Sequence, residues 1–269
     1  MHYPWNDRRF TMQCSSYDCR KLLLIAVILF SACIPCSASG LSVLCYHQIA
    51  PDAENIMTTT PTLFASHMKY LRENGYTPLS IKDAVLHMRG VRYRSDKPFL
   101  ITFDDGYDGI YTYAYPIMKR YRFPAIVFLV VSQITDSGNH HHLTWTQLDE
   151  MQKSGLLSVG SHTYNLHVKI PEELDSGRLT AGRLLNDLII SRNSIRKHLG
   201  VDTPYFAWPY GRYDDRALTT ARKAGFTVFF TTDYGANHAG DGALRIRRIR
   251  LSSSYDTVER LKEKLEQFQ

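Results

Sequence analysis

Two adjacent carboxylates, Asp104 and Asp105, directly follow an apolar run that begins at Pro98. Gly106 comes next and lets the chain turn sharply. Burying two neighbouring anions at the end of a strand is costly unless a cation or a proton compensates their charge. A metal ion held by one carboxylate, with the other left as a base, would provide that compensation. The alternative is a solvated Asp-Asp-Gly turn on the protein surface.

Two histidines, His162 and His167, follow a second apolar run, Leu157–Ser161. Imidazole nitrogens bind divalent ions, and two histidines with one aspartate supply three protein ligands and leave coordination positions open, as catalytic zinc sites require. Their spacing of five differs from the spacing of four that places two side chains on one helical face. We therefore expect a loop to bring His167 around to the site.

Two further segments end in residues suited to the same chemistry. The run from Phe206 to Arg212 contains Pro-Tyr-Gly, which favours a rigid turn that offers a backbone N–H and an aromatic wall to a ligand. Core packing of Phe206 and Trp208 is the alternative interpretation. A further apolar run, Leu41–His47, ends in a histidine. A lone histidine there is usually structural, but His47 would supply the neutral-pH acid that the other residues lack.

These residues need strands and helices that bring them together. Short apolar runs alternate with helical patterns, which predicts a parallel sheet, open or closed, in one α/β domain. If the sheet closes into a barrel, the polar residues at the carboxyl ends of its strands are expected to carry the chemistry. The predicted strands are Leu41–His47, Pro98–Phe103, Ala125–Val131, Leu157–Ser161, Tyr205–Trp208, Thr227–Thr231 and Leu244–Ile249. The predicted helices are Phe64–Asn74, Ile81–Met88, Tyr111–Tyr121, Thr146–Lys153, Leu179–Leu199, Asp214–Ala224 and Thr257–Phe268.

The composition is that of a globular protein that carries a leader. The chain has 269 residues, of which 44% are hydrophobic and 22% charged, and this excludes a disordered tail or a collagen-like repeat. Within residues 1–39, Arg20 and Lys21 precede the apolar run Leu22–Phe30 and a group of small residues, the pattern of a secretory signal. We predict export to the periplasm, the outer membrane or the extracellular space. Cleavage after Ala38 to Gly40 and lipidation of Cys33 remain alternatives.

Charge and cysteine usage restrict the partners and the disulfides. Without residues 1–39 the net charge falls from +6 to +4 and is spread along the chain without a basic block, so we expect no nucleic-acid partner. Of the five cysteines, only Cys45 lies outside the leader, and the mature chain can therefore form no internal disulfide. Cys45 is predicted to be a small buried residue on a strand.

Taken together, Thr102–Gly106, Ser161–His167 and Trp208–Gly211 resemble the motifs of the polysaccharide deacetylases of carbohydrate esterase family 4. The resemblance runs from Leu41 to Arg250 and is greatest for bacterial poly-β-1,6-N-acetyl-D-glucosamine N-deacetylases. It implies a distorted (β/α)₇ barrel in a single domain, residues 40–269, that hydrolyses the acetamide bonds of an N-acetylated polysaccharide. It also implies a partner in the machinery that synthesises or exports exopolysaccharide. Chitin oligomers, peptidoglycan or acetylated xylan are alternative substrates, and a non-catalytic carbohydrate-binding module is the alternative function.

The resemblance also implies roles for the polar residues. Asp105, His162 and His167 match the ligands of one divalent metal ion, with Zn²⁺ expected first and Co²⁺, Ni²⁺ or Fe²⁺ as alternatives. Asp104 matches the base that takes a proton from the attacking water. His47, in its protonated form, matches the acid that protonates the departing amine.

The third motif carries the rest of the implied site and one departure from the family pattern. Tyr210 matches the position whose backbone N–H holds the oxyanion, and Trp208 and Pro209 are predicted to bind substrate. Ala207 stands where the family has an arginine that contacts the base.

Four arginines near the end of the barrel region could supply the missing contact. Strand alternation would point Arg245 and Arg247 to one side and Arg248 and Arg250 to the other. One of the four is predicted to lie against a carboxylate such as Asp104, without a choice among them.

Overall fold

A curled sheet of parallel strands runs through the part of the chain that this computed structural model describes, which comprises residues 40–52, 56–91, 97–137, 141–251 and 255–268. The predicted leader, residues 1–39 with Cys33, lies outside the described residues. Within the described ranges, no helix has both the length and the apolar character needed to cross a bilayer.

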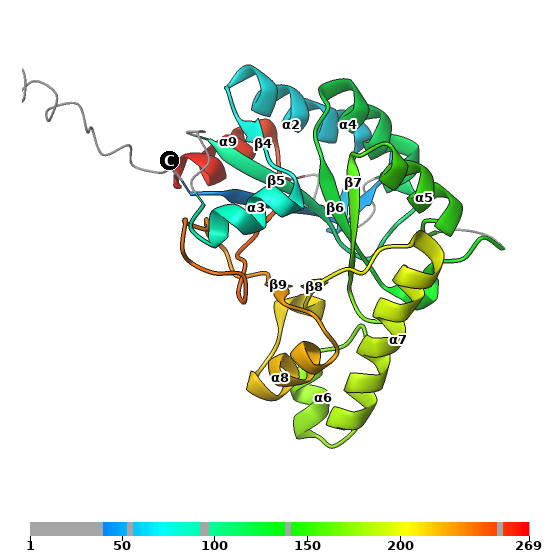
Figure 1. The fold of residues 1–269 in the computed structure, drawn as a ribbon. Coiled ribbons are helices and arrows are strands. Elements are labelled where there is room, and N and C mark those ends of the chain that lie inside the picture. Colours follow the sequence, from blue (N-terminus) through cyan, green and yellow to red (C-terminus); the bar gives the residue numbers. More distant parts are fainter. Residues whose placement is uncertain (1–39, 53–55, 92–96, 138–140, 252–254, 269) are drawn as a thin grey trace, which may run out of the picture. The chain divides into compact units, whose positions relative to one another are not determined.

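The main sheet is built from short strands that pair in parallel throughout. Its strands are β1 (Ser42–Tyr46), β4 (Thr77–Pro78), β5 (Pro98–Phe103), β6 (Ala125–Leu129), β7 (Leu157–Ser161), β8 (Tyr205–Ala207), β9 (Val228–Phe230) and β10 (Ile249–Arg250). The strand order is β10-β1-β5-β6-β7-β8-β9, and β4 pairs with the start of β5 (Figure 1). Two more strands, β2 (Gln48–Ile49) and β3 (Thr58–Thr59), form a separate pair.

Helices connect the strands. They are α2 (Pro61–Glu73), α3 (Ile81–Met88), α4 (Tyr115–Tyr121), α5 (Trp145–Lys153), α6 (Ile170–Asp175), α7 (Ala181–Leu199), α8 (Asp215–Lys223) and α9 (Val258–Glu266). A π-helical turn, η1 (Ile110–Ala114), precedes α4, and 3₁₀ turns form η2 (Val131–Gln133) and η3 (Pro209–Gly211). Six of these helices begin at a Ser, Thr or Asp whose side chain accepts a hydrogen bond from a backbone N–H of the first turn.

The central strands are buried on both faces, as expected of a parallel sheet covered by helices. In β5, Phe99, Ile101 and Phe103 belong to the outer core beneath α2, α4, α5 and α9. The alternate residue Leu100 joins Phe128 of β6 in the core enclosed by the curled sheet. A third apolar cluster joins α6, α7 and α8 to β8 and β9, and these three helices gather around the two strands in Figure 1.

The two edges of the sheet are joined by one segment, residues 246–250. Ile246 forms a parallel bridge with Phe230 of β9, and Ile249 pairs with Leu44 of β1. This arrangement confirms the predicted distorted (β/α)₇ barrel in a single domain. The strand predicted at Leu244–Ile249 is wrong in extent, because the chain crosses between the two sheet edges there.

Local sequence patterns predicted most of the other elements. The observed bounds of β5, β7 and α3 equal the predicted ones. Those of β1, β6, β8, β9, α2, α5, α7, α8 and α9 differ by at most three residues at each end. The helix predicted at Tyr111–Tyr121 is divided into η1 and α4. The short strands β2, β3 and β4 and the helix α6 were not predicted, because two to six residues carry too little periodicity.

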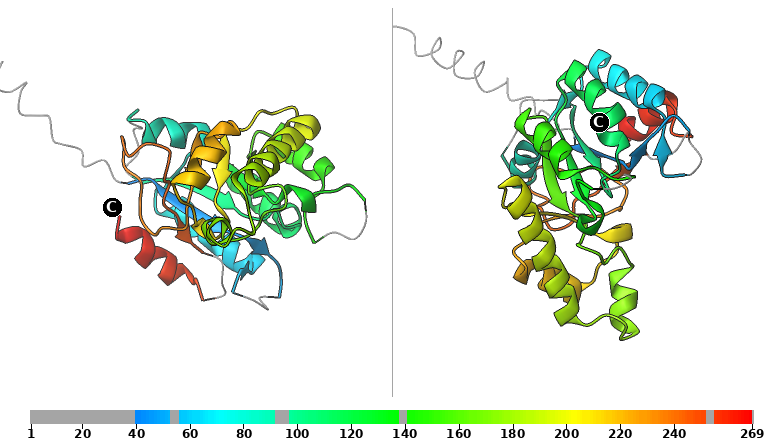
Figure 2. Two further views of the ribbon diagram at one scale, coloured as in Figure 1. Left: turned by 90° about the horizontal axis from the view of Figure 1, so that it is seen from below. Right: turned by 90° about the vertical axis from the view of Figure 1, so that its right-hand side faces the viewer.

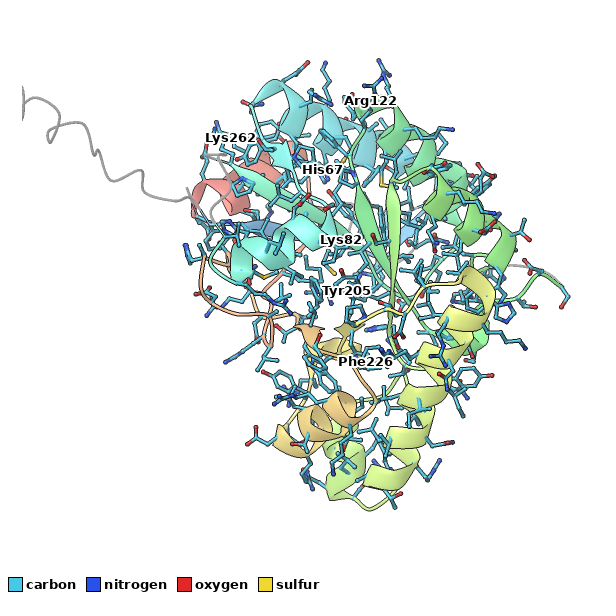
Figure 3. All side chains as sticks on the ribbon, in the orientation of Figure 1. His67, Lys82, Arg122, Tyr205, Phe226 and Lys262 are labelled. Carbon is cyan, nitrogen blue, oxygen red and sulfur yellow. The ribbon has the colours of Figure 1, made fainter. Side chains whose placement is uncertain are left out.

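One buried histidine, His67, joins α2 to β1 and to the start of α9. Its Nδ1 lies 3.0 Å from the hydroxyl of Tyr46, and its Nε2 lies 2.7 Å from the carbonyl oxygen of Asp256 (His67 is labelled in Figure 3). A carbonyl only accepts, so Nε2 carries the hydrogen and Nδ1 accepts from Tyr46. Burial lowers the pKa of His67 to about 4, although the backbone and carboxylate of Asp256 raise it; Lys264 lowers it further. Figure 2 shows α9, in red, beside α2.

We expect acid to destabilise the protein through His67. The imidazole takes up a proton at a pKa of about 6.5 in the unfolded chain and at about 4 in the folded one. The unfolded state is therefore favoured as the pH falls from 6.5 towards 4, and the full stability is present only above 6.5. The free energy of unfolding should fall by about 2 kcal/mol between pH 7.5 and pH 5 from this group alone. Urea unfolding at both pH values should show a smaller fall in His67→Asn, and an equal fall in both proteins would refute the assignment.

Candidate active site

The carboxyl ends of the parallel strands meet at one edge of the sheet, where the predicted residues lie. The register pairs Tyr46 of β1 with Phe103 of β5, so the next residues along each strand, His47 and Asp104, become neighbours. The Asp104 N–H donates to the Tyr46 carbonyl at 3.0 Å. His162 follows β7 at the same edge.

Asp105, His162 and His167 form a compact set of metal-ligand atoms. One atom from each lies within 4.8 Å of the other two. The Nε2 atoms of His167 and His162 are 3.4 and 3.7 Å from Oδ1 of Asp105. This oxygen is buried and has no hydrogen-bond partner among the described residues. An unsatisfied carboxylate oxygen that faces two imidazole nitrogens fits a divalent cation, and Zn²⁺ binds such donors.

A hydrogen bond to the backbone orients the ring of His162 so that its other nitrogen could bind a metal ion. Its Nδ1 lies 2.7 Å from the carbonyl oxygen of Ala207, which only accepts, so Nδ1 carries the hydrogen and the lone pair of Nε2 faces Asp105. Burial lowers the pKa values of His162 and His167, although the charge of Asp104 raises them. Both imidazoles are therefore neutral at pH 7, which is the form that binds a metal.

The backbone is strained at three residues of the site. Asp105, Thr163 and Tyr210 have φ values of +68°, +81° and +57°, and among the described residues only one other non-glycine residue has a positive φ. Such conformations persist where the surrounding structure imposes them, and they cluster at functional sites. Gly211 follows Tyr210 at φ +70°, and a Cβ there would lie 2.1 Å from Oγ1 of Thr232. The turn therefore requires glycine.

Asp104 lies beside this set, buried and bound by Arg248. Nη1 and Nη2 of Arg248 donate to the two carboxylate oxygens at 2.7 and 2.8 Å, and its Nε donates to the carbonyl of Thr231 at 2.7 Å. Burial alone would raise the pKa of Asp104, but the charge and hydrogen bonds of Arg248, together with the neighbouring His162 and His47, outweigh burial and hold this pKa well below its usual range. Asp104 is therefore ionised at any working pH. This pair confirms the prediction that one arginine of the group lies against a carboxylate.

The predicted alternation within the arginine group is wrong. Arg248 is buried, whereas Arg250, expected on the same side, is exposed together with Arg245 and Arg247. The reason is that the chain crosses from β9 to β1 here and does not continue as a regular strand. Arg248 thus supplies the contact with Asp104 that Ala207 cannot make.

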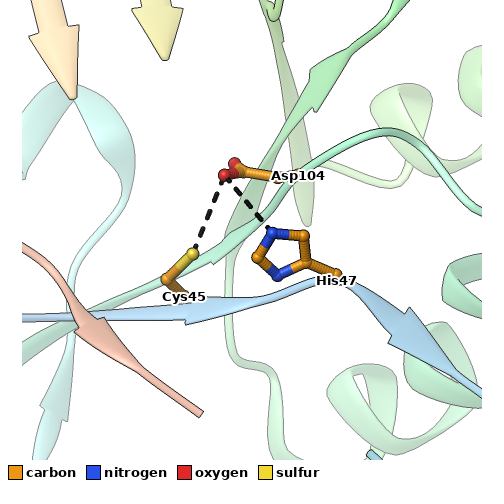
Figure 4. Close-up of side chains that lie close together, drawn as sticks. All are labelled: Cys45, His47 and Asp104. Carbon is orange, nitrogen blue, oxygen red and sulfur yellow. Dashed lines mark hydrogen bonds and ion pairs between the residues drawn. The ribbon is translucent and has the colours of Figure 1, made fainter. Parts of the chain in front are cut away.

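Cys45, within β1, and His47, directly after it, flank Asp104 (Figure 4). Nε2 of His47 is 3.9 Å from Oδ2 of Asp104, and the thiol of Cys45 donates to the same oxygen at 3.8 Å. Cys45 is buried, as predicted. Its Sγ, a nitrogen of His47 and an oxygen of Asp104 also lie within 4.8 Å of one another. Arg248 already occupies both carboxylate oxygens, however, and burial raises the pKa of the thiol to about 12, so a cation is disfavoured there.

Burial determines the protonation state of His47 in the resting site. Burial lowers its pKa to about 4, an effect that the charge of Asp104 opposes and that Arg248 reinforces. His47 is thus neutral in the resting site at pH 7 and can act as an acid only after it has received a proton.

The loop after β8 places Tyr210 beside His167, whereas Trp208 and Pro209, just before it, lie in the core. The ring of Tyr210 lies 4.9 Å from the ring of His167, and the residue is 52% exposed. Trp208 is 0% exposed and stacks on Tyr213, and Pro209 is also buried. The predicted substrate contacts of the Trp208 and Pro209 side chains are therefore wrong. Trp208 instead packs in the apolar cluster that includes Ala217 and Ala221 of α8.

Sequence analysis missed one buried carboxylate near the site, Asp187 of α7. Its oxygens accept hydrogen bonds from the backbone N–H groups of Tyr164 and Asn165, at 2.8 and 2.9 Å. The spacing of five between His162 and His167 indicated a loop, but no pattern in the sequence indicated what holds it.

Comparison with known proteins relates this chain to one family of enzymes by both sequence and fold. The chain matches the family model of polysaccharide deacetylase over residues 92–229. It is 34% identical over 212 residues to the YxkH protein of Bacillus subtilis (strain 168), a match that covers 79% of this chain and 71% of that protein. It is 25% identical over 272 residues to the poly-beta-1,6-N-acetyl-D-glucosamine N-deacetylase of Escherichia coli (strain K12), covering 81% of this chain but 40% of that relative. The structure of IcaB from Ammonifex degensii superposes with a TM-score of 0.74 at 30% identity, covering 85% of this chain and 97% of IcaB.

The matched family region includes Asp104, Asp105, His162 and His167. Arg248 lies beyond it, on the segment that joins the two sheet edges. The chain therefore belongs to the polysaccharide deacetylase family, which comprises hydrolases that act on acetylated polysaccharides.

Proposed function

We propose that the protein is an exported, metal-dependent N-deacetylase that removes acetyl groups from N-acetylglucosamine units of poly-β-1,6-N-acetyl-D-glucosamine. The observation that carries the proposal is the convergence of Asp105, His162 and His167 within 4.8 Å, beside the ionised Asp104. The name of the Escherichia coli relative supports this choice of polymer.

Each residue of the site has a part in this chemistry. A divalent ion held by Asp105, His162 and His167 would polarise the acetamide carbonyl and lower the pKa of water towards about 7. Asp104 is ionised and accepts a proton from the attacking water. His47 lies 3.9 Å from Asp104, is neutral at rest, and can receive this proton and pass it to the departing sugar amine. The backbone N–H of Tyr210 would stabilise the oxyanion, and one such donor contributes roughly 3 kcal/mol.

Other functions on the same fold are weaker candidates. Chitin oligomers, peptidoglycan and acetylated xylan need the same chemistry and differ only in how the polymer is bound. A carbohydrate-binding module has no use for a buried ionised base, whose burial is costly and whose position requires Arg248. The Asp104–Arg248 pair therefore favours an enzyme.

Export and the partners of the protein belong to the proposal as well. They rest on the sequence pattern of residues 1–39, with lipidation of Cys33 or cleavage after Ala38 to Gly40 as the alternatives. An exported deacetylase of this kind would act beside the machinery that synthesises or exports the exopolysaccharide.

Acetate release from poly-β-1,6-N-acetyl-D-glucosamine is the experiment that tests the proposal. We expect release by the purified protein, loss of release after chelation, and recovery when Zn²⁺, Co²⁺, Ni²⁺ or Fe²⁺ is returned. Chitin oligomers, peptidoglycan and acetylated xylan serve as parallel substrates. Release that survives exhaustive chelation would contradict metal dependence, and release from none of the polymers would leave the binding module as the better explanation.

A further inference from the structure

We propose that Asp187 is a positioning residue that sets the metal affinity of the site by holding the loop that carries His167. The inference rests on the proposed function, because it concerns the same metal site. Asp187 lies on α7 and is not one of the residues whose ligand atoms converge. Its effect would therefore pass through the backbone of residues 163–165.

The carboxylate of Asp187 binds two consecutive backbone amides. Oδ1 accepts from the N–H of Tyr164 at 2.8 Å, and Oδ2 accepts from the N–H of Asn165 at 2.9 Å. Asp187 is 9% exposed, so water competes little for these bonds. Burial raises the pKa of Asp187, whereas the two amides lower it. Both oxygens are thus committed to the loop.

The same helix holds the loop at a second point. Ser191, one turn after Asp187, lies with its hydroxyl 2.6 Å from the hydroxyl of Ser161 at the end of β7. The Ser161 oxygen in turn accepts from the N–H of Thr163 at 3.1 Å. All three consecutive amides, residues 163–165, therefore depend on side chains rather than on regular secondary structure.

The opposite side of the loop is held by η2. The N–H of Val131 donates to the carbonyl of Thr163 at 3.1 Å, and the N–H of Ser132 donates to the carbonyl of Tyr164 at 2.9 Å. The loop is thus clamped between α7 and η2, and this clamp maintains the strained φ of +81° at Thr163.

His167 depends on this clamp more than the other ligands do. His162 directly follows β7, and its ring is anchored by the carbonyl of Ala207. The His167 side chain is 33% exposed, and within the described ranges its ring makes no hydrogen bond that would orient it. Its position relative to Asp105 is therefore set by the backbone that precedes it.

The substitution Asp187→Asn tests this inference with a change of one functional group. The asparagine amide would point an N–H at a backbone N–H, so one loop bond is lost while the side-chain volume is kept. We expect the Kd for Zn²⁺ to rise about 10- to 100-fold, as for other residues that orient metal ligands. Competition with a chromophoric chelator measures this Kd without any substrate, and excess Zn²⁺ should restore the rate of acetate release.

Two comparisons separate positioning from general destabilisation. Asp149→Asn makes the same substitution on an exposed helical residue that pairs with Lys153, and should leave the Kd unchanged. In a His167→Ala background, Asp187→Asn should produce no further weakening, because the residue through which it acts is gone. Equal weakening in both backgrounds, or an unchanged Kd in Asp187→Asn, overturns the inference. A native protein that binds no divalent ion overturns the metal site itself and this inference with it.

Discussion

Replacing Asp104 with asparagine should lower the rate of acetate release about 10³-fold, the middle of the range for removal of a general base. The variant keeps the size of the side chain but cannot accept a proton from water. Asp105, His162 and His167 are untouched, so Zn²⁺ should still bind. The expected pattern is therefore a large fall in kcat with metal affinity retained.

Stability has to be controlled in this experiment. Asparagine offers Arg248 one oxygen in place of two charged ones, and the buried guanidinium loses part of its compensation. Circular dichroism should confirm that the variant is folded at the assay temperature. Asp149→Asn serves as the matched exposed substitution and should retain full activity. A folded Asp104→Asn protein that keeps more than about a tenth of the native rate would exclude Asp104 as the base.

Replacing Arg248 with methionine should reduce the free energy of unfolding by about 3–5 kcal/mol, the usual effect of removing one partner of a buried ion pair. Arg248 and Asp104 have side chains only 1% and 3% exposed, so water cannot take over the lost interaction. Without the guanidinium, burial would raise the pKa of Asp104. Activity should fall as well, because Arg248 holds the carboxylate in place.

The same segment provides a matched control. Arg245 forms an ion pair with Asp233 at 2.8 Å, but the two side chains are 64% and 41% exposed. Arg245→Met should therefore cost less than about 1 kcal/mol. The double variant Asp104→Asn/Arg248→Met should regain stability relative to Arg248→Met, but not activity, since it restores charge balance without a base. Urea unfolding of the four proteins measures this, and similar losses in Arg245→Met and Arg248→Met would contradict a special role for the buried pair.

Local sequence by itself determined the strands that form the sheet and the residues that follow them. Apolar runs bounded by turn residues predicted Pro98–Phe103 and Leu157–Ser161 to the residue. Because parallel strands end at one edge of the sheet, the side chains after these runs had to lie near one another. The structure brings Asp104, Asp105 and His162 together in this way, and a single spacing in the chain was enough to indicate a loop before His167.

Only the tertiary structure decided which arginine meets Asp104, how His47 is protonated, and what holds the loop that carries His167. Arg248 is 144 residues from Asp104 in the chain, and its burial depends on where residues 246–250 cross between the edges of the sheet. Asp187 is 22 residues from Asn165 and accepts a hydrogen bond from its backbone N–H, an interaction that does not depend on the residue types near the motif. Burial and long-range hydrogen bonds arise from packing between distant segments. No local pattern of polar and apolar residues can therefore specify them.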